Sequence, residues 1–113
     1  MAHLSTHILD TSRGRPAEGV AITLERRGDA GWTKLGEGIT DHDGRAGNLL
    51  PAGETLIAGD YRLTFAVAAY FESLKVGVFY PEVIVQVRLD GSVDRHHLPL
   101  LLNPYGYSTY RGS

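Results

Sequence analysis

Apolar and polar residues alternate along several short segments of the chain, and this period of two predicts half-buried β-strands. The clearest alternation covers residues 82–89, whose apolar positions are Val83, Val85, Val87 and Leu89. Residues 20–25 follow the same rule, with one face formed by Val20, Ile22 and Leu24. Residues 61–67 form a further strand, with one face formed by Tyr61, Leu63 and Phe65. These faces are the candidate core of the protein.

Less regular apolar segments predict further strands over residues 4–9, 32–39, 46–50, 93–102 and 107–111. The prediction for residues 32–39 is weak because the segment holds Gly36 and Gly38, which lower strand stability. Pro99 lacks a backbone N–H, so it argues for a sheet edge or a bulge within residues 93–102.

One helix is expected over residues 66–75, which contain good helix formers and no breaker, and Gly77 and Pro81 should end it. Clusters of turn-forming residues separate the other segments, at residues 28–31, 41–44, 90–91 and 103–106. The pair Asp90-Gly91 is typical of a β-hairpin. Seven or eight short strands with these turns predict a single all-β domain over residues 1–113, an antiparallel sandwich or barrel.

The composition is that of an ordinary globular protein, and it removes several classes of function. Hydrophobic residues make up 42% of the 113 positions, and a formal net charge of −2 predicts no nucleic-acid partner and no membrane partner. Cysteine is absent, which excludes disulfides, thiolate nucleophiles and cysteine-based metal sites. No segment is apolar for the length of a bilayer and residues 1–7 lack a signal-peptide pattern, so we expect a cytoplasmic protein.

Five histidines invite a metal hypothesis: His3, His7, His42, His96 and His97. His3 and His7 share a face of a predicted strand, but residues four apart on a strand lie about 13 Å from each other. His96 and His97 are adjacent, so they face opposite sides of a regular strand. The sequence therefore gives no metal signature, and we expect no metal and no other cofactor.

Two other site chemistries also lack support. No Gly-x-Ser-x-Gly segment marks a nucleophilic serine. The segment Asp41-His42-Asp43-Gly44 resembles the start of a calcium loop, but the further oxygen ligands are missing, so we expect a β-turn. If the protein is a hydrolase, water is the expected nucleophile and a histidine its base.

Residues 107–113, Tyr-Ser-Thr-Tyr-Arg-Gly-Ser, are unusual for a chain end, since ends commonly fray and this one is rich in aromatic and β-forming residues. The segment can be an ordinary sheet strand with a polar end. It can equally bring the guanidinium of Arg111 and the hydroxyl and carboxylate of Ser113 into a site. The residues alone leave both readings open.

Five segments form a set that covers almost the whole chain: residues 4–17 (Leu-Ser-Thr-His-Ile-Leu-Asp, then Gly-Arg-Pro-Ala), 40–45 (Thr-Asp-His-Asp-Gly-Arg), 70–83 (Tyr-Phe, then Phe-Tyr-Pro-Glu-Val), 97–102 and 107–113. Together they resemble the transthyretin-related 5-hydroxyisourate hydrolases. The closing Tyr-Arg-Gly-Ser is the most specific element, since the carrier transthyretin shares the fold and lacks it. Tyr80 and Asn103 stand where phenylalanine and serine are common in that family.

The resemblance implies a transthyretin-like two-sheet antiparallel β-sandwich of about eight strands with one short helix. It also implies a homotetramer with active sites between its dimers. The implied reaction is hydrolysis of 5-hydroxyisourate to 2-oxo-4-hydroxy-4-carboxy-5-ureidoimidazoline in urate catabolism. The expected catalytic residues are His7, Arg45, His97 and Ser113, and the expected substrate-binding residues are Arg45, Tyr110, Arg111 and Gly112.

As a hypothesis, His7 and His97 divide the proton transfers between them, and the sequence leaves open which one is the base. Arg45 would stabilise charge on the attacked carbonyl group. His3, His42 and His96 are expected to have no role in the reaction. The alternative is a small-ligand binding protein of the transthyretin type without catalysis.

Overall fold

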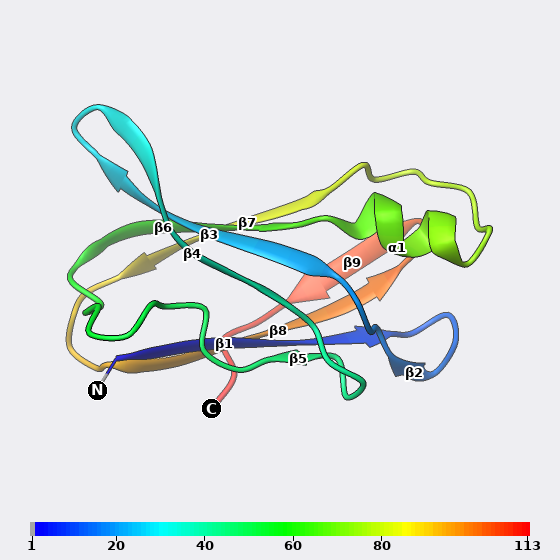
Figure 1. The fold of residues 1–113 in the computed structure, drawn as a ribbon, viewed down its shortest axis with the longest axis horizontal. Coiled ribbons are helices and arrows are strands. Elements are labelled where there is room, and N and C mark those ends of the chain that lie inside the picture. Colours follow the sequence, from blue (N-terminus) through cyan, green and yellow to red (C-terminus); the bar gives the residue numbers. More distant parts are fainter. Residues whose placement is uncertain (1) are drawn as a thin grey trace.

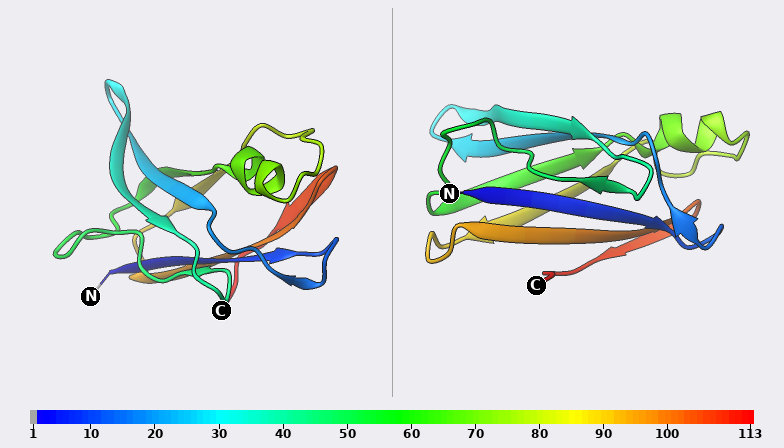
Figure 2. Two further views of the ribbon diagram at one scale, coloured as in Figure 1. Left: turned by 45° about the vertical axis from the view of Figure 1, so that its right-hand side comes forward. Right: turned by 60° about the horizontal axis from the view of Figure 1, so that its bottom comes forward.

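The computed structural model describes residues 2–113 and consists of two β-sheets packed face to face, with a short helix at one end (Figures 1 and 2). The first sheet has the order β2-β1-β8-β9, with β5 also beside β1; its strands are β1 (His3–Asp10), β2 (Arg15–Pro16), β5 (Arg45–Ala46), β8 (Arg95–Asn103) and β9 (Gly106–Thr109). The second sheet has the order β4-β3-β6-β7; its strands are β3 (Ala21–Gly28), β4 (Gly31–Ile39), β6 (Gly59–Phe65) and β7 (Val83–Leu89). The predicted two-sheet sandwich with one helix is confirmed.

Burial alternates along the strands as the hydrophobic pattern predicts. In β7, Val83 and Val85 are buried, whereas Ile84 and Gln86 between them are exposed. The second sheet contributes fully buried side chains to the core, among them Ile22, Leu24, Tyr61, Leu63 and Phe65. The first sheet contributes Leu4, Ile8, Leu100 and Leu102 to the same cluster. The core therefore fills the space between the two sheets.

The strand pairing departs from the antiparallel prediction at one place. β1 and β8 pair in parallel from His3–Arg95 to Asp10–Leu102, whereas the other strand pairs within residues 2–113 are antiparallel. The hairpin predicted at Asp90-Gly91 is wrong, because β7 and β8 lie in different sheets. The turn residues reverse the chain, with Gly91 at a φ of 80°, but they do not decide which strand pairs next.

Pro99 lies inside the first sheet and not at its edge, because β8 has β1 on one side and β9 on the other. β8 and β9 pair from Leu100 opposite Thr109 to Asn103 opposite Gly106. On the other side of Pro99, an isolated bridge pairs His97 with Gly112 in the same register. The ladder lapses around Pro99, which has no N–H to donate. The Thr109 hydroxyl donates to the Pro99 carbonyl oxygen at 2.7 Å and holds the two segments together there.

The helix α1 (Val67–Ser73) is shorter than predicted and ends before Gly77. Lys75 adopts a left-handed φ of 60°, and the N–H of Val76 donates to the Phe71 carbonyl oxygen at 3.0 Å. This is a Schellman-type end with lysine in the position that glycine usually takes. No helix in residues 2–113 is long and apolar enough to cross a membrane.

The strand predicted over residues 46–50 is mostly wrong, since β5 is limited to Arg45–Ala46. Beyond β5, the segment is held to Leu4 of β1 by two hydrogen bonds: Oδ1 of Asn48 accepts the N–H of Leu4 at 3.1 Å, and the N–H of Leu49 donates to the Leu4 carbonyl oxygen at 2.8 Å. The following loop crosses β4 so closely that a Cβ on Gly36 would overlap the Leu49 carbonyl oxygen. The glycine that weakened the prediction of β4 therefore makes room for this loop.

A buried hydrogen-bond network holds the end of β1 against α1. The Tyr70 hydroxyl donates to Oδ2 of Asp10 at 2.7 Å, and the Ser12 hydroxyl donates to Oδ1 at 2.6 Å. Burial alone raises the pKa of Asp10, but the hydrogen bonds from Ser12, Tyr70 and Arg13 together hold it below its ordinary value. The charged carboxylate therefore stabilises the fold above its ordinary pKa, and this contribution is lost as the pH falls through the lowered value.

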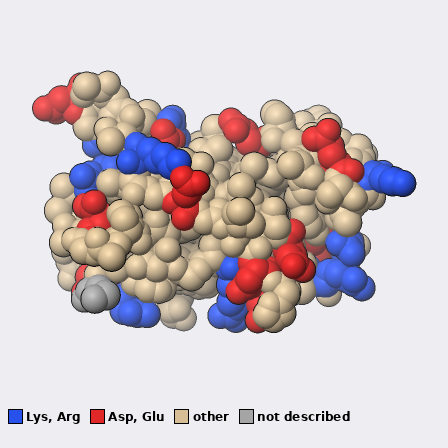
Figure 3. All heavy atoms as spheres, viewed as in Figure 1, with Lys and Arg blue, Asp and Glu red and all other residues tan. Residues whose placement is uncertain are grey.

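Charges of both signs are interspersed on the face of the molecule shown in Figure 3. On the outer face of the second sheet, Arg62 pairs with Glu25 at 2.8 Å and Arg88 pairs with Asp60 at 2.7 Å. The Arg62 guanidinium also lies 4.3 Å from the ring centre of Trp32. This outer face thus carries these two ion pairs together with exposed apolar residues such as Ile84.

Candidate active site

The outer face of the first sheet carries three of the five histidines. Along β1, His3, Ser5 and His7 alternate with residues that point into the core. The parallel register places Ser5 directly beside His97 of β8. His3 and His7 are then the diagonal neighbours of His97, at positions about 7–8 Å apart on a sheet.

Arg45 reaches this face through the predicted β-turn. Oδ1 of Asp41 accepts the N–H of Arg45 at 3.1 Å, and Gly44 has a φ of 76°. A Cβ on Gly44 would overlap the Ile8 carbonyl oxygen, so glycine is needed for β5 to come this close to β1. The resulting pairing sets Arg45 beside His7.

His97 is held by the neighbouring strand. Its Nδ1 lies 2.8 Å from the Ser5 hydroxyl oxygen, and the ring is half-buried. With the proton on Nδ1, the ring donates to Ser5 and leaves the lone pair of Nε2 free; this hydrogen bond survives when Nε2 takes up a second proton. Ser5 had no role in the sequence prediction, although its place two residues before His7 put it on the same strand face.

The surroundings of His97 favour its neutral form. Burial lowers the pKa of His97 below the ordinary value of 6.5, and the positive charges of His7, Arg45 and His3 lower it further. The imidazole is therefore largely unprotonated near neutral pH. An unprotonated imidazole is what a general base requires.

The C-terminal segment returns to β8 after β9 has ended at Thr109, two residues before the predicted end. The N–H of Gly112 donates to the His97 carbonyl oxygen at 2.9 Å. A Cβ on Gly112 would lie 2.8 Å from Cδ2 of His97 and 3.1 Å from the Pro99 ring. Gly112 thus lies close against the His97 imidazole, with no room for a side chain between them.

A groove of about 650 Å³ runs over this face. Its lining includes three of the four expected catalytic residues and one expected substrate-binding glycine: Arg45, His97, Ser113 and Gly112. His7 lies beside Arg45 on the same face, but it is not among the described residues that line the groove. The fold therefore brings Arg45, His97 and Ser113 together, with His7 as their neighbour.

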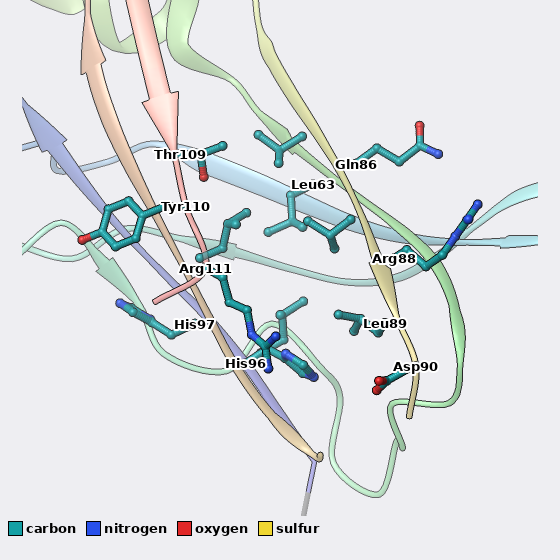
Figure 4. A pocket seen from close by; sticks show the side chains of 14 residues that line it. Leu63, Gln86, Arg88, Leu89, Asp90, His96, His97, Thr109, Tyr110 and Arg111 are labelled. Atoms are coloured by element: carbon teal, nitrogen blue, oxygen red, sulfur yellow. The ribbon is translucent and has the colours of Figure 1, made fainter. Parts of the chain in front are cut away.

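A second cavity, of about 450 Å³, opens between the two sheets (Figure 4). Leucine and valine side chains line one part of it, and polar side chains, among them His97, Tyr110 and Arg111, line the rest. The Arg111 side chain extends beside His96 at this cavity, whereas Tyr110 and His97 extend to the opposite side of the segment (Figure 4). Arg111 also lines the groove. Contact of Arg111 and Tyr110 with a substrate stays a prediction.

One cluster of possible metal ligands occurs within residues 2–113. The ligand atoms of Asp41, His42 and Asp43 lie within 4.8 Å of one another, and all three side chains are exposed. None of these three residues lines the groove. All three lie in the turn before Arg45, and it is the Asp41 side chain that accepts the N–H of Arg45.

Comparison with known proteins agrees with this fold. Residues 4–112 match the model of the HIUase/Transthyretin family. A 5-hydroxyisourate hydrolase of Salmonella dublin is 49% identical over 110 residues, which cover 97% of this chain and 80% of that protein. The solved structure of Klebsiella pneumoniae 5-hydroxyisourate hydrolase is 38% identical with a TM-score of 0.86, and the match covers 100% of both chains. Sea bream transthyretin, solved in complex with thyroxine, is 30% identical with a TM-score of 0.90, covering 98% of this chain and 95% of that chain.

The fold and the groove together define a transthyretin-like sandwich in which imidazole and guanidinium groups gather on the outer face of one sheet. The chain belongs to the HIUase/Transthyretin family. The resemblance inferred from the motifs is thereby confirmed. Because a 5-hydroxyisourate hydrolase and thyroxine-bound transthyretin share this fold, the fold alone does not decide between the two functions.

Proposed function

We propose that this protein hydrolyses 5-hydroxyisourate to 2-oxo-4-hydroxy-4-carboxy-5-ureidoimidazoline, a step of urate and purine catabolism. The observation that carries the proposal is His97, held by Ser5 in a groove with Arg45 on one side and Gly112 and Ser113 on the other. The 49% identity to a protein named 5-hydroxyisourate hydrolase supports the same substrate. A flat ring with several carbonyl groups suits the planar donors of arginine and histidine.

The reaction is hydrolysis of a ring amide by water. Nε2 of His97 accepts a proton as the water oxygen bonds to the carbonyl carbon. The tetrahedral oxyanion then collapses, the C–N bond breaks, the ring nitrogen takes up a proton, and the carbonyl carbon becomes a carboxylate. A well-placed base of this kind typically accelerates a reaction by roughly 10²–10⁴-fold.

The neighbours of His97 supply the remaining steps. Arg45 stabilises the negative charge that develops on the carbonyl oxygen. His7, which pairs with Arg45 across the strands, orients the substrate or protonates the leaving nitrogen. The C-terminal segment holds the water and the ring in place through Tyr110, Arg111, Gly112 and Ser113. The hydrogen bond with Ser5 and the place of His97 in the lining of the groove are the reasons for choosing His97 as the base over His7.

We infer that the active form is a homotetramer with the groove at the interface between two dimers. A second copy facing the groove would exclude bulk water, which strengthens electrostatic stabilisation inside the site. The edge strands β7 and β9 have backbone groups free to pair with further copies. Gel filtration with light scattering tests this assembly, and a fully active monomer would contradict it. The cytoplasmic location stays a prediction.

The second candidate function is binding of a small ligand without catalysis, because sea bream transthyretin has the same fold and is solved with thyroxine. The polar lining of the groove, with Arg45, His97 and Ser113, favours a polar substrate over a large apolar hormone. The two functions differ in turnover, which one assay measures.

That assay generates 5-hydroxyisourate in place with urate oxidase and follows its ultraviolet absorbance, which decays slowly without a catalyst. We expect catalytic amounts of the protein to accelerate the decay in proportion to enzyme concentration. Thyroxine binding without acceleration would support the carrier and overturn the hydrolase proposal. Heat-denatured protein at the same concentration is the control.

A further inference from the structure

His3 is the member of the histidine group that the proposed reaction leaves without a role. It lies on the outer face of β1, two residues before Ser5, and it is half-buried. The parallel ladder fixes its position, since its N–H donates to the Asp94 carbonyl oxygen at 2.7 Å and it pairs with Arg95. His3 lines the groove, unlike His7.

The groove is arranged along a line with His97 near its middle. Ser5 of β1 lies beside His97 of β8. Two residues further along β1, His7 pairs with Arg45 of β5, and two residues in the opposite direction lies His3. Ser5 and Gly47 line the groove with small side chains, which leave room above the sheet for a substrate. A Cβ on Gly47 would have no atom within contact distance. A flat substrate that reaches Arg45 at one end and Nε2 of His97 at its centre therefore extends toward His3 at the other end.

We propose that His3 is a substrate-positioning residue of this site, whose imidazole hydrogen-bonds the edge of the substrate ring system farthest from Arg45. The inference rests on the proposed function and adds the residue that fixes the far end of the ring. Amide groups on a urate-like ring offer both carbonyl oxygens and N–H groups, and a neutral imidazole can serve either. His3 takes no part in proton transfer to or from the reacting amide.

The charged and titratable groups around His97 agree with this placement. From β1 they are His3 and His7, from β5 Arg45, from β8 Arg95 and His96, and from the C-terminal segment Tyr110 and Arg111. Asp94 also lines the groove near His3. His3 and His97 both line the groove, and a charge on His3 would be close enough to act on His97. The two imidazoles therefore lie at the same groove.

The test is steady-state kinetics on 5-hydroxyisourate with His3→Ala, His3→Phe and His3→Gln, and with His42→Ala as the matched control. His42 is an exposed histidine of the 41–44 turn and does not line the groove. Loss of one hydrogen bond to substrate should raise KM about five- to tenfold in His3→Ala and His3→Phe, with kcat within about twofold. Glutamine keeps a donor and an acceptor, so His3→Gln should recover most of the lost KM, and His42→Ala should match the unchanged protein.

An unchanged KM in His3→Ala, with the unmodified protein active, would overturn the role of His3 and leave the hydrolase proposal intact. A fall in kcat as large as that of a His97 variant would also overturn it, because His3 would then act in the chemical step. If KM rises in His3→Ala and not in His3→Phe, the effect comes from packing and the hydrogen-bond role is wrong. An inactive unmodified protein would contradict the proposed function itself and the role of His3 with it.

Discussion

The two faces of the sheet that contains β1 and β8 share one backbone and have opposite chemistry. The inner face is apolar, and its side chains are at most 7% exposed: Leu4, Ile8, Leu98, Leu100 and Leu102. The outer face is formed by the residues that alternate with these along the strands, and it carries imidazole and hydroxyl groups: His3, Ser5, His7 and His97. Along β1, core residues therefore alternate one by one with polar residues of the proposed site.

The difference between the faces shows how strongly the site depends on register. A slip of one residue would exchange the two faces of a strand. The Thr6 side chain on the inner face is fully buried, and its hydroxyl donates to the Leu98 carbonyl oxygen at 2.6 Å. Substitutions on the outer face should therefore change the reaction and spare stability, and substitutions on the inner face should do the reverse.

The largest effect is expected on the outer face, from His97→Ala. Loss of the proposed general base should lower kcat by about 10²–10⁴-fold, while the urea midpoint of unfolding stays close to that of the unmodified protein. The exposed His42→Ala is the control and should leave kcat unchanged. A kcat within threefold of normal in His97→Ala would remove His97 from the chemical step.

The inner face should respond to Leu100→Ala in the opposite way. Leu100 is fully buried, so its truncation should lower the free energy of unfolding by about 2–5 kcal/mol. The neighbour Leu101 points outward and is half-buried, so Leu101→Ala should lower the free energy of unfolding by clearly less. Urea denaturation measures both variants, and kcat per folded molecule should change little in Leu100→Ala. An equal loss of unfolding free energy in the two variants would contradict the placement of Leu100 on the inner face and Leu101 on the outer face.

Gly112→Ala sharpens the comparison at the segment that covers the outer face. The added Cβ would lie 2.8 Å from the His97 ring, so the imidazole or the segment must shift. We expect kcat to fall about tenfold, since small misplacements of reacting groups are costly. Gly106→Ala is the matched control, because its Cβ would meet the Asn103 side chain at 3.7 Å, an ordinary contact. Similar rates for the two variants would show that Gly112 does not position His97.

The smallest effect is a displacement of the pH profile. Burial and nearby positive charges hold the pKa of His97 below 6.5, so the base stays unprotonated as the pH falls to that value. The acid limb of kcat/KM should therefore begin below about pH 6.5 and reflect protonation of free His97. Initial rates between pH 5 and pH 8 measure it. A limb centred above 6.5 would point to a different base.

The inner face could be predicted from the sequence far better than the arrangement of the strands. Alternation along residues 82–89 and 61–65 identified buried positions correctly, because burial of a strand face depends on local period alone. The partner of β1 could not be predicted this way. Its parallel pairing with β8 joins segments 92 residues apart, and the turn at Asp90-Gly91 gave no sign that the chain changes sheets there.

The outer face was predictable only as far as the family motifs reached. They identified Arg45, His97 and Ser113, which the fold brings to one groove. They gave no role to Ser5, whose function is the hydrogen bond to His97 and depends on the register between two distant strands. The lapse of pairing at Pro99 likewise became visible only with β9 in place.

The parallel pairing of β1 with β8 also has a consequence for biosynthesis. The groove needs residues from both, which are 92 positions apart in sequence, so no nascent chain can assemble it until β8 has left the ribosome. Closing so long a loop is slow, and a fold dominated by such distant contacts has a high contact order. During synthesis β1 can pair with β2 and β5, but the edge that β8 will occupy stays uncovered until β8 emerges. An uncovered strand edge next to an apolar face is open to aggregation during this interval.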